Sequence, residues 1–248
     1  MSKVVLITGA SRGIGRATAR LAGARGWCVG VNYVGHAEAA ARSVSEVEAA
    51  GGRAVALQGD ISVEADVMAM FDATQRAFGG LDGLVNNAGI VAPAMPLAEM
   101  GSERLQRMFA VNVYGAFLCA REAARRLSTA RGGRGGAIVN VSSGAARRGG
   151  ANTYVDYAAS KGALDTLTVG LAQELGRQGV RVNGVRPGLI DTEIHAVTGA
   201  PDRAKVLGTN TPIGRCGNAE EVAEAILWLL SDAASYVSGA TLDVTGGL

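Results

Sequence analysis

The sequence is poor in the residues from which many enzymes build their sites. It has two histidines, His36 and His195, and three cysteines, Cys28, Cys119 and Cys216, with no close pair among them. Two histidines are too few to favour a histidine-based triad or metal centre. Three dispersed cysteines argue against a disulfide framework or a structural zinc site. We expect no metal, and we expect reduced, buried thiols in a cytoplasmic protein.

Long apolar runs and a strong net charge are also missing. No segment approaches the length of a membrane span, and the opening apolar run from Val4 to Ile7 is too short for a signal peptide. The formal net charge of +2 gives no reason to expect nucleic-acid binding. Arginines do cluster at positions 125, 126, 131, 134, 147 and 148, which we interpret as solvated surface.

Aromatic residues make up only 4% of the chain, whereas glycines number 36 and apolar residues reach 48%. Short strand-like runs alternate with helical patterns from one end to the other. Strands are expected at 4–7, 28–33, 54–57, 83–85, 137–141, 180–185 and 241–244, and helices at 14–25, 37–50, 63–78, 102–126, 154–177 and 220–230. This alternation predicts a three-layer, doubly wound Rossmann fold with a mainly parallel sheet and helices on both faces. No linker divides the chain, so we expect a single domain over residues 1–248.

A glycine-rich loop follows the first expected strand and opens the first helix. It reads Thr8-Gly9-Ala10-Ser11-Arg12-Gly13-Ile14-Gly15. Glycines there let a pyrophosphate approach the backbone, and a helix N-terminus offers free N–H groups and a positive dipole end. The spacing Gly-x-x-x-Gly-x-Gly in this strand–turn–helix context predicts dinucleotide binding.

The end of the second expected strand indicates which dinucleotide is bound. An acidic residue there would hydrogen-bond the ribose 2′-hydroxyl of NAD, but the sequence reads Val31-Asn32-Tyr33-Val34 and has no carboxylate. Arg12, inside the glycine loop, could pair with a 2′-phosphate. Both observations favour NADP over NAD.

Tyr157 and Lys161 lie one helical turn apart, in a chain whose 24 basic residues include three lysines. A lysine one turn from a tyrosine can tune the tyrosine pKa, which makes Tyr157 a candidate acid/base. Ser142 and Ser143 close the fifth expected strand, and a hydroxyl there could polarise a substrate carbonyl.

The motifs together resemble the short-chain dehydrogenase/reductase family, of the compact single-domain type, over the whole chain. The glycine loop, Asn86-Asn87-Ala88-Gly89, Ser143, Tyr157-x-x-x-Lys161 and Pro187-Gly188 stand in the family's order. Within the family the chain is similar to bacterial glucose-dehydrogenase-like and 3-oxoacyl-carrier-protein-reductase-like members. The resemblance implies a seven-stranded sheet of order 3-2-1-4-5-6-7.

It also implies an oxidoreductase that moves a hydride between NADP(H) and a carbonyl/alcohol substrate. Tyr157 would be the general acid/base, with its pKa lowered by Lys161 and the oxidised cofactor; Ser143 would hold the substrate oxygen; Asn112 would support a water in a proton relay. The implied cofactor-binding residues are Gly9, Ser11, Arg12, Gly13, Ile14, Gly15, Asn32, Tyr33, Asp60, Ile61, Asn87, Ala88, Gly89, Tyr157, Lys161, Pro187, Gly188, Ile190 and Thr192.

Four further expectations concern the surroundings of the site. A substrate lid is expected at about 192–215, which mixes glycine, proline and polar residues. The gap from Ser143 to Tyr157 is one residue longer than is common in the family, which we expect to alter the substrate rim. Small residues around Gly162 favour a homotetramer packed through this helix. An acyl-carrier-protein partner would need a positive patch beside the cleft, which the sequence does not place.

Three alternative functions remain. A non-catalytic dinucleotide-binding regulator on the same fold has no need of the Ser143, Tyr157 and Lys161 set. An epimerase or dehydratase is disfavoured because the part after Thr192 leaves little room for a sugar-nucleotide domain. A nucleic-acid module built on the arginine-rich loop would show salt-sensitive binding.

Overall fold

A seven-stranded sheet forms the centre of the molecule in the computed structural model, which describes residues 2–194 and 202–248. The strand order is β3-β2-β1-β4-β5-β6-β7, and every neighbouring pair is parallel. The strands are β1 (Val4–Ile7), β2 (Cys28–Tyr33), β3 (Arg53–Gln58), β4 (Gly83–Asn86), β5 (Gly136–Val141), β6 (Val180–Pro187) and β7 (Thr241–Val244). The predicted fold class and strand order are confirmed.

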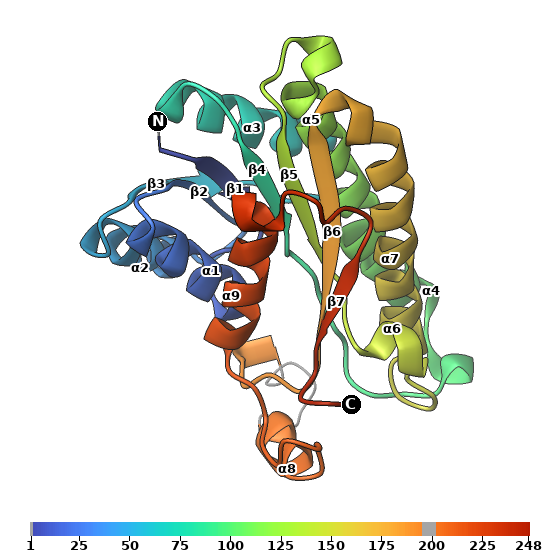
Figure 1. Cartoon of the computed structure of the whole chain (residues 1–248). Helices are drawn as coiled ribbons and strands as arrows, with labels where there is room; N and C mark the ends of the chain where they lie inside the picture. The colour runs from blue at the N-terminus through green and yellow to red at the C-terminus, as the bar shows by residue number, and fades with distance from the viewer. Residues whose placement is uncertain (1, 195–201) are drawn as a thin grey trace.

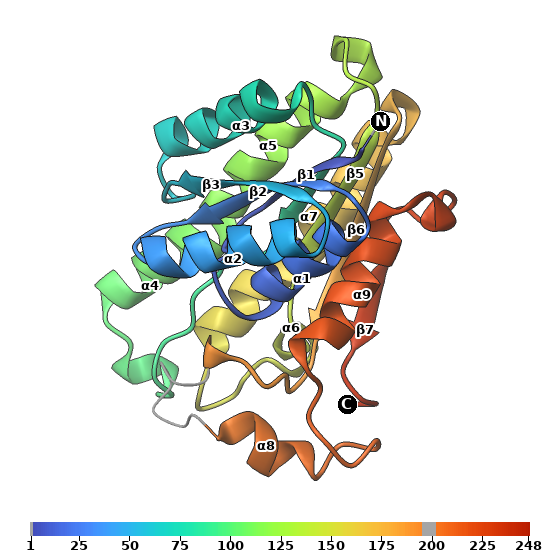
Figure 2. The ribbon, with the colours of Figure 1, turned by 90° about the vertical axis from the view of Figure 1, so that its left-hand side faces the viewer.

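Helices cover both faces of the sheet (Figures 1 and 2). The layer on one face is formed by α1 (Gly13–Ala24), α2 (Ala37–Ala49) and α9 (Ala219–Leu230), and the other by α3 (Glu64–Phe78), α5 (Ala116–Leu127) and α7 (Val155–Leu175). Because successive side chains of a strand point to opposite faces, Ile7 packs in the core under α1 and α9 while Leu6 packs in the core under α3 and α5. Both faces of the central strands are therefore buried, as the continuous apolar runs predict.

The helix predicted over 102–126 is interrupted in its middle. It consists of α4 (Ser102–Phe109), a π-helical segment (Ala110–Gly115) and α5, so its single predicted span is wrong in this detail. A π-helical turn inserts one residue into the α-helical pattern and is frequent at functional sites. Asn112 lies within this segment and is fully buried.

Several short elements gather beyond the carboxyl ends of the strands. A short helix, α6 (Ala145–Arg148), connects β5 to α7, and α8 (Arg203–Gly208) lies near the C-terminus at the same end of the molecule (Figure 1). The lid predicted at about 192–215 includes α8, but its residues 195–201 lie outside the described residues.

From the sequence we expect neither membrane-spanning helices nor metal-binding groups. No helix in residues 2–194 and 202–248 has both the length and the apolar character needed to cross a membrane. In the same residues, no three metal-ligating side chains come together.

Candidate active site

A continuous cleft runs along the carboxyl ends of the central strands. Its first half is lined by the glycine loop, the ends of β2 and β3, and 87–90, and its second half by Ser143, Tyr157, Lys161 and 187–190. Ile14, Asn87, Gly89, Thr192 and Ile194 line both halves. Since β1 and β4 are neighbours at the point where the strand order reverses, the cleft lies where doubly wound folds bind dinucleotides.

The glycine loop has the shape of a phosphate cradle. Gly13 has a φ of +52°, and a Cβ on Gly15 would lie 2.5 Å from the carbonyl oxygen of Gly9, so a side chain at either position would distort the loop. Arg12, the residue preceding α1, makes no side-chain cap, which leaves the first N–H groups of the helix available to an anion. The loop therefore fits the pyrophosphate of a dinucleotide, although Gly15 lies beneath the cleft and does not line it.

Two asparagines predicted to bind cofactor hold the loop in place. The Asn32 side chain accepts a hydrogen bond from the Gly9 N–H (3.0 Å) and donates to the Gly59 carbonyl (2.9 Å). The Asn87 side chain donates to the carbonyls of Thr8 (2.8 Å) and Gly9 (3.2 Å). Both residues line the cleft, but their side-chain amides are committed to backbone groups and position the loop.

Thr8 joins β1 to the loop after β4 and was not among the predicted site residues. Its buried hydroxyl accepts hydrogen bonds from the N–H groups of Asn87 and Ala88, both at 2.9 Å, and donates to the Val85 carbonyl. The sequence signal was its place directly before Gly9, at the end of an apolar strand. Thr8 fixes the distance between the glycine loop and the Asn-Ala-Gly turn.

The far end of the cleft brings together Arg12, Tyr33, His36, Asp60 and Arg107. Burial alone would raise the pKa of Asp60, but hydrogen bonds from Ser62 and Arg107 outweigh burial and lower that pKa. Arg12 is exposed and has no ion-pair partner within residues 2–194 and 202–248. A free guanidinium therefore lies where the adenosine ribose of a dinucleotide would be held.

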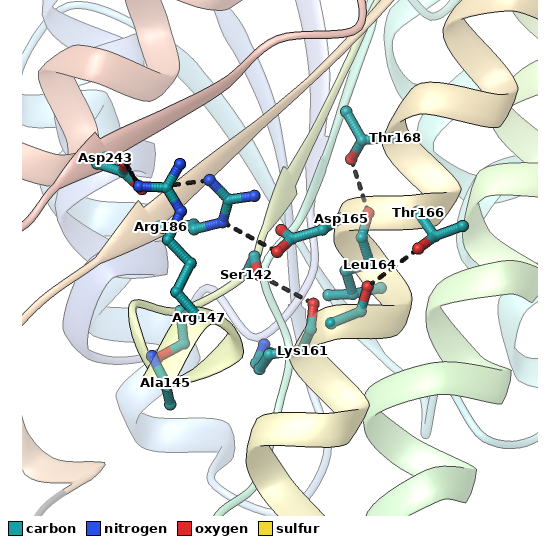
Figure 3. A network of polar contacts seen from close by, with 12 residues as sticks. Ser142, Ala145, Arg147, Lys161, Leu164, Asp165, Thr166, Thr168, Arg186 and Asp243 are labelled. Carbon is teal, nitrogen blue, oxygen red and sulfur yellow. Dashed lines mark hydrogen bonds and ion pairs between the residues drawn. The ribbon is translucent and has the colours of Figure 1, made fainter. Parts of the chain in front are cut away.

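The reaction half centres on Ser143, Tyr157 and Lys161. The Ser143 hydroxyl hydrogen-bonds the phenol of Tyr157, and Lys161 Nζ lies 5.8 Å from the centroid of the tyrosine ring. Ser142 also lines the cavity, but its hydroxyl is engaged with backbone: it donates to the carbonyl of Lys161 at 3.0 Å (Figure 3). The geometry thus separates the two serines by their partners: the Ser143 hydroxyl contacts Tyr157, whereas the Ser142 hydroxyl supports α7.

In the protein alone the pKa of Tyr157 is raised, and the lowering predicted from Lys161 and the oxidised cofactor together stays a prediction. Burial raises the Tyr157 pKa, and the hydrogen bond from Ser143 only partly offsets the effect. Burial also lowers the pKa of Lys161 to about 8, although nearby Asp165 acts in the opposite direction. Lys161 Nζ donates to the Val141 carbonyl at 2.8 Å, so its charge is directed at backbone and not only at the phenol.

Asn112 clamps the segment beside Lys161. Its side-chain oxygen accepts from the Ile90 N–H (2.8 Å), and its amide donates to the Ile90 carbonyl (2.9 Å) and to Ser160 Oγ (3.1 Å). A Cβ on Gly89 would lie 3.1 Å from Lys161 Nζ and 3.4 Å from Asn112 Oδ1, so both groups border one small space. Asn112 belongs to the π-helical segment and lies buried behind the cleft, with its side chain on Ile90 and Ser160.

A chain of ion pairs connects the elements around the reaction half of the cleft (Figure 3). Asp165, one turn beyond Lys161 on α7, accepts from Arg186 Nε at 2.9 Å, and Arg186 also pairs with Asp243 at 3.3 Å. Asp243 in turn pairs with Arg147 of α6 at 2.6 Å. The network connects α6, α7 and the ends of β6 and β7, the elements that surround Ser143 and Tyr157.

The reaction cavity has a volume of about 200 Å³ and is mostly apolar. The predicted Pro187, Gly188, Ile190 and Thr192 line it as expected. Leu189 and Ile194, from the segments expected to border the pocket, also line it, as do Arg148 and Tyr154, which were not predicted as site residues. Arg148 belongs to a group interpreted from sequence as solvated surface, and no pattern in the sequence distinguishes it from its neighbours.

The fold and the cleft are those of a dinucleotide-binding protein with a Ser–Tyr–Lys group beside the binding site, and comparison with known proteins specifies the family. The family model described as "Enoyl-(Acyl carrier protein) reductase" matches residues 9–248. The chain is 52% identical to "Uncharacterized oxidoreductase YgfF" of Escherichia coli K12, over 98% of this chain and 99% of that protein. It is 42% identical to "Cis-4-hydroxycyclohexanecarboxylate dehydrogenase" of Sinomonas cyclohexanicum, over 99% and 96% of the two chains.

The structure agrees with these sequence relationships. A short-chain dehydrogenase/reductase of Serratia marcescens, solved as a double mutant, superposes with a TM-score of 0.90 at 36% identity, covering 99% of this chain and 97% of that one. The chain belongs to the short-chain dehydrogenase/reductase family. It is accordingly an oxidoreductase that acts on CH–OH groups with a nicotinamide dinucleotide.

Proposed function

We propose that the chain is an NADP-dependent enzyme that interconverts a small alcohol and its carbonyl compound, with Tyr157 as general acid/base. The observation that carries this proposal is the meeting of Ser143, Tyr157 and Lys161 in one cavity that continues into the dinucleotide cleft. A pure sensor would need the cleft but not this trio, which argues against a non-catalytic regulator. We assign dinucleotide binding and catalysis to one domain over residues 1–248, with a substrate lid at about 192–215.

The bound cofactor would carry the hydride, and the side chains would orient the substrate and move the proton. In reduction, Tyr157 gives its phenolic proton to the carbonyl oxygen while Ser143 donates a hydrogen bond to that oxygen. The raised pKa of Tyr157 keeps the phenol protonated, which suits the acid role. In oxidation, the tyrosinate must be stabilised by Ser143, by Lys161 and by the positive charge of the oxidised nicotinamide.

Lys161 and Asn112 have supporting roles in this mechanism. Lys161 Nζ would bind the nicotinamide ribose as well as the Val141 carbonyl, which already holds it. The space above Gly89, bordered by Lys161 Nζ and Asn112 Oδ1, would hold a water that returns the proton to solvent. The Asn112 clamp on Ile90 keeps that space open.

The preference for NADP rests on Arg12. Its exposed guanidinium has no ion-pair partner among the described residues, and the end of β2 presents Asn32 and Tyr33 instead of a carboxylate. A hydrogen bond to a charged group contributes about 1.5–3 kcal/mol. Arg12→Gln should therefore raise KM for NADPH roughly ten- to hundredfold and leave KM for NADH nearly unchanged.

Initial rates with NADPH and NADH over a panel of ketones, sugars and 3-oxoacyl compounds test both parts of the proposal. Turnover with NADPH well above that with NADH supports the cofactor assignment, and equal or better turnover with NADH rejects it. Arg76→Gln, at an exposed arginine of α3 without an ion-pair or hydrogen-bond partner among the described residues, is the control for charge removal. Confirmed NADP(H) binding without turnover of any carbonyl would instead favour the regulator.

A cytoplasmic homotetramer is part of the proposal. Exposed apolar side chains on two faces support it: Tyr114, Phe117 and Val169 beside the groove between α5 and α7, and Trp228 and Tyr236 near β7. Two such faces suit two kinds of two-fold contact. Buried free Cys28 and Cys119 suit a reducing compartment, whereas Cys216 is only half-buried. Light scattering that gives the mass of one chain would refute the tetramer.

A further inference from the structure

Two adjacent arginines of α6 differ in what they contact. Arg147 Nη1 pairs with Asp243 Oδ2 at 2.6 Å and belongs to the ion-pair network of Figure 3. Arg148 has no ion-pair or hydrogen-bond partner in residues 2–194 and 202–248. The charge of Arg147 is therefore balanced by Asp243, whereas the charge of Arg148 remains available to a ligand.

The exposed guanidinium of Arg148 lies beside the reacting groups. Arg148 lines the reaction cavity together with Ser143, Tyr154 and Tyr157. Its side chain folds back over Gly144, where a Cβ would lie 3.3 Å from Arg148 Nη2. Gly144 directly follows Ser143, so this cation is close to the serine that would hold the substrate oxygen.

The charge of the cavity is entirely positive. Among the described residues that line it, the charged ones are Lys161 and Arg148, and none is acidic. Lys161 Nζ already donates to the Val141 carbonyl deep in the cleft. Most other lining side chains are apolar, among them Leu189 and Ile194. Arg148 is therefore the cation that remains for a substrate, at the edge of an apolar chamber.

We propose that the substrate carries a carboxylate, which Arg148 binds while Ser143 and Tyr157 hold the reacting oxygen. This inference rests on the proposed carbonyl/alcohol chemistry and adds the substrate class: a hydroxy acid or oxo acid whose two polar ends are separated by an apolar spacer. A guanidinium matches a carboxylate with two parallel hydrogen bonds, which fixes the orientation of the spacer as well as its charge. Leu189 and Ile194 would contact that spacer.

Paired substrates that differ only in the carboxylate test this assignment. One pair is 4-oxocyclohexanecarboxylate and 4-methylcyclohexanone, and the other is 4-oxopentanoate and 2-pentanone. Reduction of each would be measured for the unaltered enzyme, Arg148→Gln, Arg148→Lys and the remote control Arg76→Gln. Because Arg148 is partly solvated, its loss should lower kcat/KM for the oxo acids about tenfold, mainly through KM.

The unaltered enzyme should prefer each oxo acid to its neutral partner. Arg148→Gln should remove that preference without lowering kcat/KM for the neutral ketones. Arg148→Lys should restore part of the preference. Equal use of acid and neutral ketone by the unaltered enzyme, or a preference that survives Arg148→Gln, would overturn the carboxylate assignment while leaving the carbonyl reductase intact. Absence of turnover for every ketone, with NADPH bound, would overturn the proposed function and this inference with it.

Discussion

Replacing Lys161 with methionine should make the protein more stable while abolishing its activity. Burial lowers the pKa of Lys161 from 10.5 to about 8, and each pKa unit corresponds to about 1.4 kcal/mol, so keeping this lysine charged costs about 3 kcal/mol below pH 8. The variant loses the hydrogen bond to the Val141 carbonyl, which contributes about 1 kcal/mol. Lys161→Met should therefore gain about 1–2 kcal/mol, or about 2–8 °C in Tm.

The pH dependence gives this prediction a sign. Between about pH 8 and 10.5 the unfolded chain binds a proton at Lys161 that the folded chain has released, so the unaltered protein gains stability as pH rises. The advantage of Lys161→Met should be complete below pH 8 and should fade across that window. Lys205→Met, at an exposed lysine, is the matched control and should change Tm little. Thermal unfolding at pH 7 and pH 10 measures the stability gain of Lys161→Met and its dependence on pH. A Lys161→Met variant that is less stable than the unaltered protein at pH 7, or a gain that is the same at both pH values, refutes the reasoning.

Two other predictions separate catalytic from positioning groups. Ser143→Ala should lower kcat roughly a hundredfold or more in steady-state assays. Ser142→Ala should mainly lower the free energy of unfolding, by about 1 kcal/mol in denaturant unfolding. The reverse pattern would contradict the assignment of the two hydroxyls. Asn112→Ala leaves the N–H and carbonyl of Ile90 without partners, so it should destabilise the fold by about 2–5 kcal/mol, and an unchanged urea midpoint would contradict the clamp.

Much of the fold could be predicted because its signals are local. Apolar runs such as Val4 to Ile7 are short, rich in β-branched residues and closed by glycine, and the structure confirms each of the seven predicted strands. The π-helical turn at Asn112 could not be predicted, since the same residue types continue an α-helical pattern on both sides. One inserted residue rotates the side chains that follow it around the helix without changing the composition.

The site was predicted less completely, for a different reason. The motifs identify residues by position, but pKa values and charge pairing depend on burial and on distant partners. The pKa of Tyr157 is raised because the fold partly shields the half-buried phenol from water, which the Tyr-x-x-x-Lys spacing does not report. Arg147 and Arg148 are neighbours in sequence, yet only the fold places Asp243 beside the first and the reaction cavity beside the second.

The central claim is that Tyr157 moves the proton, and Tyr157→Phe tests it most directly. The substitution removes only the phenolic oxygen, so NADPH affinity measured by fluorescence titration should stay unchanged. The single-turnover rate of NADPH oxidation by a ketone substrate should fall roughly 10²–10⁴-fold. Full retention of that rate with normal NADPH binding would contradict the mechanism.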